Sequence, residues 1–491
     1  MQGVAAVVWI LTLAVAAGVA RRLFLFLIVI ASVGVAALVR RRPSWLFLIL
    51  VAAGAAALGA RASSNYARDC EAVERMSAVA GAANVTLDGI VGGFPQSGPQ
   101  GTTFDFITRI EGRRVCLVVR AECFDAAYGD RYLLRARFTH PTASTRSFIA
   151  SRGASGVVRV RARDVTRLGC GGNPALRAVF WPLHRFARTR LSRAMGSDAG
   201  LAIGMLLGER AQMDEPVRDA VRRLGITHLL AISGMHLTTL AGCVLLATRL
   251  WPRGRSMTLL AVLTIYTLSV GNIESLTRAY VMAAILIATH TVIRPARPID
   301  ALAKALLVMA VASPLCLRSV GLQLSFAATF VVLLMLPHQW HPSTADGNRL
   351  KRWSVAAMKS LGAAFVMSVA VEVFIAPLQL HHFHVLSVAG PLATVVFFFP
   401  LTVVLLAAVP VVALVCVFPA QEWPGHLLGS FSLATTHAIQ VCGRITPGPF
   451  HVPEPNPWIY YGVLVAGWRW RCWLRDAAKR AFLVWVPRRR R

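Results

Sequence analysis

Long apolar runs separated by short polar links fill the chain from residue 226 onward. Candidate membrane spans follow one another at residues 227–249, 257–271, 275–293, 300–317, 319–336, 354–376, 390–418, 427–442 and 457–468. A helix needs about 20 apolar residues to cross a bilayer core, so the run at 390–418 is too long for one straight span, and Pro400 and Pro410 are expected to split or kink it. The chain is 56% hydrophobic and 15% charged, whereas soluble proteins carry about 25% charged residues. These features predict a polytopic α-helical membrane protein.

The stretch ITHLLAISGMHLTTLAG, at residues 226–242, stands out among these runs. It is apolar, yet it contains His228, Ser233, Gly234 and His236. Polar side chains are costly in hydrocarbon, so they normally face protein or a water-filled cavity. The Ser-Gly pair also predicts a kink or an interruption in the helix, and interrupted membrane helices often mark a transport site.

This stretch, together with GMLLGERAQMDEPVRDAVRRLG before it, resembles the core signature of the ComEC competence family. In that family an LLLG-(D/E)-R element leads through an amphipathic helix into HLLAISG-(L/M)-H. Later segments are similar as well, namely SLTRA, QLSF and APL…HF…VS. One departure is Thr394, where the family often has Asn. The resemblance implies a bacterial membrane protein that carries single-stranded DNA across the cytoplasmic membrane during natural transformation.

The N-terminal part, residues 1–61, is predicted to hold about three transmembrane helices, at residues 4–20, 23–39 and 45–60. The arginine triplet at residues 40–42 places that link in the cytoplasm by the positive-inside rule. The chain would then leave residue 60 on the outer side. The pair Arg21 and Arg22 argues for the opposite orientation.

Residues 62–175 are polar and contain short segments of alternating hydrophobicity: NVTLDGIVGG, TFDFITRIEG, RRVCLVVRAEC, DRYLLRARFTH and SGVVRVRARDV. This pattern predicts a small antiparallel barrel or sandwich, and five such strands suit an OB-fold. The family resemblance implies an OB-like extracytoplasmic domain at the same place. The aromatic side chains are expected mainly to fill the barrel core, with base stacking as the alternative: Phe104, Phe106, Tyr128, Tyr132 and Phe138.

Four of the nine cysteines lie in this polar region: Cys70, Cys116, Cys123 and Cys170. In an exported domain they would suit one or two disulfides, and sequence alone leaves three pairings open. The alternative is a set of unpaired thiols in a reducing compartment. The sequence contains no CxxC motif or Cys/His cluster, so no metal site and no cofactor is predicted.

Residues 176–225 are predicted to form amphipathic interfacial helices. The first is basic and would lie among lipid headgroups, or would form an electropositive vestibule for DNA. The second begins after Asp214, spans residues 215–224 and ends at Gly225. Residues 226–470 form the predicted channel domain, and residues 471–491 a basic, Trp-rich cytoplasmic tail.

Polar residues at membrane depth are the candidates for the lining of a channel. The set is His228, Ser233, Gly234, His236, Asn272, Glu274, Arg278, Gln323 and Glu372. Glu274 and Arg278 are four residues apart and could pair on one helix face. A serine-hydrolase interpretation of Ser233 and His236 lacks a local group that would orient the base. The histidines at positions 381, 382 and 384 lack further metal ligands at a suitable spacing, so no metal site is predicted there. With neither a triad nor a metal site, no catalytic residue is predicted, and the chain is not expected to be an enzyme.

The prediction is a DNA translocation channel in the bacterial cytoplasmic membrane, with a permease for a smaller anion as the alternative. The formal net charge of +30 agrees with contact with a polyanion, but also with binding of anionic lipid or with positive-inside anchoring alone. The expected partners are single-stranded DNA, membrane lipid, a DNA receptor, and a cytoplasmic motor or single-strand-binding proteins, since no P-loop is present. No H-x-H-x-D-H motif occurs, so the metallo-β-lactamase-like domain of many ComEC proteins is expected to be absent.

Overall fold

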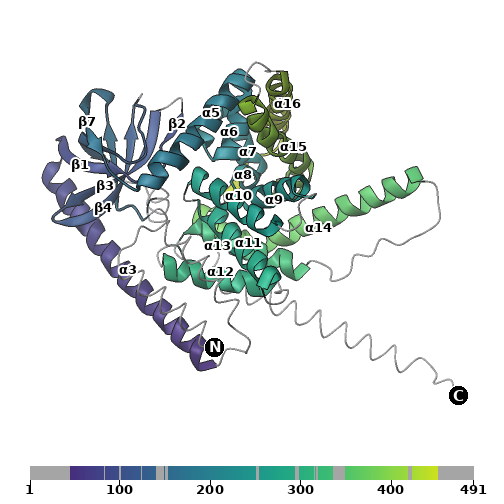
Figure 1. Cartoon of the computed structure of the whole chain (residues 1–491), viewed down its shortest axis with the longest axis horizontal. Helices are drawn as coiled ribbons and strands as arrows, with labels where there is room; N and C mark the ends of the chain where they lie inside the picture. Colours follow the sequence, from purple (N-terminus) through teal and green to yellow (C-terminus); the bar gives the residue numbers. More distant parts are fainter. Residues whose placement is uncertain are drawn as a thin grey trace.

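The computed structural model combines a β-barrel with a larger helical part (Figure 1). It describes residues 45–81, 83–98, 101–122, 124–139, 149, 153–249, 254–271, 273–292, 298–313, 316, 319–335, 349–417 and 423–451. The predicted spans at 4–20, 23–39 and 457–468 lie outside these residues, as does the basic tail.

The barrel is built from one seven-stranded sheet. Its strands are β1 (Val85–Val91), β2 (Gln96–Gly98), β3 (Gly101–Ile110), β4 (Arg113–Ala121), β5 (Asp130–Thr139), β6 (Gly156–Val160) and β7 (Val165–Cys170). Five of them close a ring in the order β1-β3-β4-β6-β5, because β5 pairs back onto β1. The pair β4–β6 is parallel and the other pairs of the ring are antiparallel. Each of the five predicted strand segments supplies one strand of this ring, so that prediction is confirmed.

Alternation of side chains along the strands creates the barrel core. In β3, buried residues alternate with more accessible ones along the whole strand, as the period of two requires. Phe104 is 1% and Phe106 0% exposed, and Tyr128 and Tyr132 are also buried, so these aromatic rings fill the interior and its edges. Burial raises the pKa of Tyr132 to about 12. The expectation that the aromatic residues fill the barrel core is confirmed for Phe104, Phe106 and Tyr132. Tyr128 is buried instead against Leu176 and Trp181, at the junction with the helical part.

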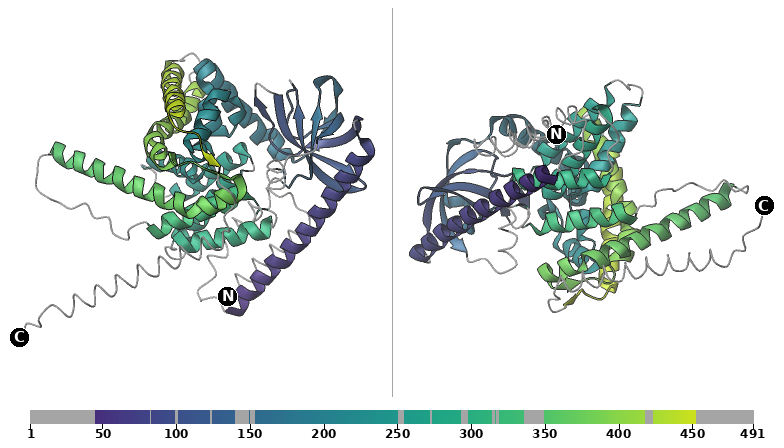
Figure 2. Two further views of the ribbon diagram at one scale, coloured as in Figure 1. Left: turned by 180° about the vertical axis from the view of Figure 1, so that it is seen from behind. Right: turned by 90° about the horizontal axis from the view of Figure 1, so that it is seen from below.

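A long helix, α3 (Trp45–Ala80), leads into the barrel (Figures 1 and 2). The predicted division at residue 61 falls inside this helix, which continues until shortly before β1. Its second half packs on the barrel, where Tyr66 donates a hydrogen bond to the carbonyl of Ala154 and Arg113 pairs with Asp69 at 3.0 Å. The barrel is therefore fixed to the end of α3.

The predicted disulfide is not formed between any two of Cys70, Cys116 and Cys170, and Cys123 lies outside the described residues. Along the sheet, β4 with Cys116 is separated from β7 with Cys170 by β6 and β5. Three strand spacings are about 14 Å, whereas a disulfide needs Cα atoms within about 7 Å. The Cys70 thiol lies beside Tyr66 and Ser155, and burial raises its pKa.

The helical part follows β7 through a short π-helical turn, Leu176–Phe180. Its helices are α5 (Trp181–Met195), α6 (Ala199–Leu207), α7 (Glu215–Leu224), α8 (Thr227–Leu230), α9 (Gly234–Ala247), α10 (Arg255–Val270), α11 (Glu274–Val292), α12 (Pro298–Ala312), α13 (Val320–Met335), α14 (Arg349–Phe383), α15 (Gly390–Val417) and α16 (Trp423–Ile445). A 3-10 turn, Arg210–Gln212, joins α6 to α7. The helix predicted at 215–224 is confirmed, with Gly225 at φ 73° after its end, a conformation that favours glycine.

Among the described residues, two helical segments are long and apolar enough to cross a membrane, Leu361–Phe383 and Gly390–Val412. Five further apolar helices are shorter, between 10 and 17 residues. The helix α15 continues without a break through Pro400 and Pro410, so the run is not split at these residues, and the alternative of a kink stays a prediction. A helix tolerates an interior proline in an apolar environment when local adjustments satisfy the freed carbonyl.

Candidate functional site

The stretch at residues 226–242 is an interrupted helix, as predicted. The short helix α8 ends at Leu230, and α9 begins at Gly234. Ser233 caps α9 with an extended backbone, and its hydroxyl accepts a hydrogen bond from the backbone N–H of Met235. The backbone N–H of Ser233 in turn donates to His236 Nδ1 at 3.2 Å. The break is therefore stabilised by a reciprocal cap.

This cap determines the state of His236. Because Nδ1 accepts a hydrogen bond from the backbone, the neutral ring carries its proton on Nε2. The side chain is 1% exposed, and Nε2 has no hydrogen-bond partner among the described residues. The Oγ of Ser233 lies 3.3 Å from Nδ1, but no carboxylate in the described part of the chain orients the ring from its other side. The pair functions as a helix cap and lacks the third member of a hydrolase triad.

The guanidinium of Arg278 lies beside the helix break. A Cβ atom at position 234 would be 3.6 Å from Arg278 Nη2 and 3.7 Å from the Cβ of Ala279. A Cβ there would make ordinary van der Waals contacts, so this site has room for a small side chain, whereas a long one would meet the guanidinium. The structure thus brings together two predicted site residues that are separated by 44 positions in the sequence.

Arg278 is buried between α11 and α13, with 6% of its surface exposed. Its Nη1 donates a hydrogen bond of 2.7 Å to the hydroxyl of Thr329, and its guanidinium carbon lies 5.7 Å from the ring centroid of Phe326. The Nε atom has no hydrogen-bond partner among the described residues. The structure does not describe the side chain of Glu274, so the expected pair with Arg278 stays a prediction. Asn272 also lies outside the described residues.

The remaining candidates lie near the start of α15 and on α13. The His228 Nε2 atom is 3.4 Å from the hydroxyl of Thr394. A Cβ at Gly390, the first residue of α15, would lie 3.9 Å from the carboxylate of Glu372. On α13, the amide of Gln323 is hydrogen-bonded to His382 of α14 at 3.0 Å.

These contacts form three pairs in the helical part: Ser233 with His236, Arg278 with Thr329, and Gln323 with His382. On α13, Phe326 is three residues from both Gln323 and Thr329, so it adjoins each of them on the helix surface. Phe326 and Thr329 contact Arg278, and Gln323 contacts His382. We name the set Ser233, His236, Arg278, Gln323, Thr329 and His382 the polar seam. It contains one buried guanidinium and hydrogen-bonding groups, and the described residues contain no cluster that would hold a metal.

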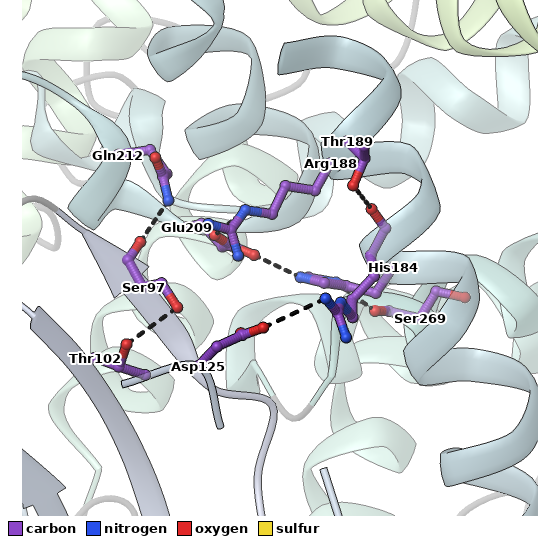
Figure 3. A network of polar contacts seen from close by, with 10 residues as sticks. Ser97, Thr102, Asp125, His184, Arg188, Thr189, Glu209, Gln212 and Ser269 are labelled. Carbon is purple, nitrogen blue, oxygen red and sulfur yellow. Dashed lines mark hydrogen bonds and ion pairs between the residues drawn. The ribbon is translucent and has the colours of Figure 1, made fainter. Parts of the chain in front are cut away.

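A second buried network was not predicted from the sequence (Figure 3). His184 on α5 bonds through Nε2 to the carboxylate of Glu209 and through Nδ1 to the carbonyl of Ser269, both at 2.8 Å. Arg188 lies 3.4 Å from the other carboxylate oxygen of Glu209. His184 and Glu209 are 2% and 1% exposed. This network ties α5, the link after α6 and the end of α10 together.

The same network lies at the junction with the barrel. The ring of Phe94, from the loop after β1, contacts both Trp181 and His184. Beside it, Gln212 Nε2 donates to the carbonyl of Ser97 in β2 at 2.5 Å (Figure 3). The barrel is thus attached to the helical part through β2 and the segment that leads to α7.

A sequence signal for this network existed in part. Glu209 is the acidic residue of the LLGER element, which resembles the family signature but does not by itself indicate a role for the side chain. His184 lies in the basic stretch before α6, whose arginines predict contact with lipid or DNA and not a buried histidine. Its burial depends on aromatic residues from the barrel, which no helical periodicity reveals.

Comparison with known proteins gives two findings. Residues 205–476, more than half of the chain, match the family described as Competence protein. The chain is also 30% identical over 192 residues to ComE operon protein 3 of Bacillus subtilis (strain 168), an alignment that covers 38% of this chain and 23% of that relative. The chain therefore matches less than a quarter of the relative's length. No solved structure matches.

Proposed function

The chain belongs to the competence protein family, and we propose that it carries single-stranded DNA across the cytoplasmic membrane of a bacterium during natural transformation. The observation that best supports this proposal is the burial of Arg278 beside the interrupted helix. An arginine within membrane helices costs roughly 2.5–3.5 kcal/mol on insertion scales. Such residues are retained where they serve an ion or substrate pathway.

The polar seam is the proposed path. A strand of DNA cannot cross hydrocarbon, so its route requires polar groups on several helices, and α9, α11, α13 and α14 each contribute one or more of them. In the structure these side chains form hydrogen-bonded pairs, such as Gln323–His382 and Arg278–Thr329. Each is a single contact that phosphates or bases could replace. Many weak contacts permit conduction, whereas one strong site would trap the strand.

The proposal includes a multi-pass arrangement in the membrane. The segments Leu361–Phe383 and Gly390–Val412 supply two spans, and the shorter apolar helices would complete the bundle around the seam. Charge or polarity at mid-membrane is tolerated where helices face one another. The absence of a P-loop motif from the sequence means that a cytoplasmic motor, or capture by single-strand-binding proteins, supplies the driving force. A DNA receptor outside the membrane would deliver the strand.

The test is a clean deletion of the gene, scored for transformation with marked DNA and for labelled DNA in the DNase-resistant pool. We expect both to be lost, while DNA still binds to the cell surface, and a plasmid copy to restore them. Normal transformation in the deletion strain would refute the proposal. Loss of uptake of a small anion in that strain would instead favour the permease alternative.

A further inference from the structure

Three arginines stand side by side on the outer face of the barrel. Arg120 of β4 is the register partner of Arg159 of β6, and Arg159 is the register partner of Arg137 of β5. All three side chains are exposed. Neighbouring strands are about 4.8 Å apart, so this arginine row spans roughly 10 Å across three strands.

The row has no acidic counterpart. The structure gives the three arginines no ion pair and no hydrogen-bond partner within the described part of the chain. Some exposed arginines of the barrel are paired, as Arg131 is with Asp88 and Arg167 with Asp130. Arg109 and Arg114 form another exposed register pair that has no ion pair among the described residues. Among the described strands, the row is the place where three such arginines are consecutive register partners on neighbouring strands.

Such a row costs stability in the absence of a ligand. Like charges directly opposite one another on a sheet are destabilising, and here the arrangement occurs twice in succession, at Arg120–Arg159 and at Arg159–Arg137. Arrangements that oppose folding are typical of functional positions. A chain of negative charges laid across the three strands would remove the repulsion.

We infer that the arginine row binds the phosphate backbone of single-stranded DNA on its way to the helical part. This inference rests on the proposed function and names a docking surface for the same substrate. In OB-type barrels the usual ligand surface is the face of the second and third strands, which here are β3 and β4. The row begins on β4 and continues onto β6 and β5, so the strand would follow the side of the barrel.

The register connects the row to the helical part. Arg120 is the partner of Thr103 in β3, and Thr103 is the partner of Gln96 in β2. The next residue of β2, Ser97, accepts the hydrogen bond from Gln212. A polar belt without an acidic residue thus runs from Arg137 to the junction that precedes α7 and the interrupted helix.

The surroundings of the row favour nucleic acid over a lipid surface. Interfacial membrane-binding elements combine basic residues with exposed apolar side chains that enter the bilayer. Among the described barrel strands, the only large exposed apolar side chain is Leu168. It belongs to β7, which pairs with the first half of β5, at Asp130–Leu134, and not with the half that carries Arg137.

The test uses the full-length protein in nanodiscs of zwitterionic lipid, with fluorescein-labelled oligo(dT) as the probe. The variant Arg120→Gln/Arg159→Gln should bind at least about tenfold more weakly, since two charge-assisted contacts are lost. The slope of log affinity against log salt should become shallower by about 1.4, since each contact with a single strand contributes about 0.7. Removing the like-charge pair should leave the thermal stability equal to or above that of the wild type.

The matched control is Arg109→Gln/Arg114→Gln. These two arginines are also exposed register partners, at the other end of β3 and β4, so the charge change is identical. We expect the control to bind almost like the wild type. Equal weakening of both variants would overturn the inference, because it would indicate attraction by net charge alone. Unchanged binding in the row variant would also overturn the inference. The proposed function is tested separately by the deletion strain, and it would still stand if that strain lost transformation.

A second measurement separates DNA from lipid. An Arg159→Cys variant is alkylated in the nanodiscs, and the peptide that contains position 159 is quantified by mass spectrometry. Oligo(dT) should slow this alkylation several-fold in zwitterionic lipid. Protection by anionic phosphatidylglycerol without DNA, and none by oligo(dT), would assign the row to the membrane surface and refute the inference.

Discussion

Gly234 leaves space for Arg278: a Cβ at position 234 would lie 3.6 Å from the Nη2 atom of the guanidinium. The start of α9 and the first turns of α11 are therefore packed against each other across a site with no side chain on one partner. A larger side chain at position 234 would have to displace the guanidinium or separate the helices. This relationship makes the site testable by a single substitution.

We expect Gly234→Leu to abolish most transformation, because the leucine side chain would occupy the space beside the guanidinium of Arg278. The protein should still reach the membrane at a near-normal level, because leucine raises hydrophobicity and helix propensity. The matched control is Gly242→Leu on the same helix, where a Cβ would meet no atom within 4 Å. Counting transformants and quantifying the membrane-inserted protein decide the result. Normal transformation by Gly234→Leu would remove this site from the path.

Arg278→Ala should also abolish most transformation with the protein present in the membrane. The sequence suggested a water-facing charge, but the side chain is buried and bonded to Thr329, so we expect some loss of stability as well. Thr329→Val separates the two effects, since it removes the hydrogen-bond partner and keeps the charge. If Arg278→Ala and Thr329→Val reduce transformation equally, the charge itself has no role.

Glu209→Ala should lower the stability of the helical part by about 1–3 kcal/mol, because it leaves His184 Nε2 without its buried partner. The ion pair with Arg188 is lost at the same time. Thermal unfolding of the purified protein measures the effect. Glu71→Ala, at an exposed position on α3, should change little, and a similar loss in both variants would contradict the structural role of Glu209.

The barrel should lose stability in acid through Asp88. The guanidinium of Arg131 holds the pKa of this carboxyl below its usual range, so its folded-state pKa lies below its unfolded-state pKa. The resulting stability is present above the unfolded-state pKa and is lost as the pH falls through the folded-state pKa. Because both side chains are largely exposed, the effect should be small. Unfolding of Asp88→Asn followed against pH should show a flatter acid limb, and an unchanged limb would contradict this assignment.

The barrel strands were predictable because their information is local. Strand alternation and turn residues are encoded within about ten positions, as in the turn Glu111–Gly112, where both residues have positive φ and fit a two-residue hairpin. The closing pair β1–β5 and the parallel pair β4–β6 join segments far apart in the sequence. The arginine row depends on this register and was therefore invisible in the sequence.

The sequence by itself determined the interrupted helix, since Ser233, Gly234 and His236 form their cap within four residues. It also determined which residues are polar within apolar helices. Only the tertiary structure decided their partners: Arg278 meets Thr329 rather than water, and Gln323 meets His382. Likewise, the burial of His184 and Glu209 requires Phe94 from the barrel and Ser269 from α10. Helical periodicity specifies which face of a helix is apolar, but the neighbour that covers a polar group is set by packing between distant segments.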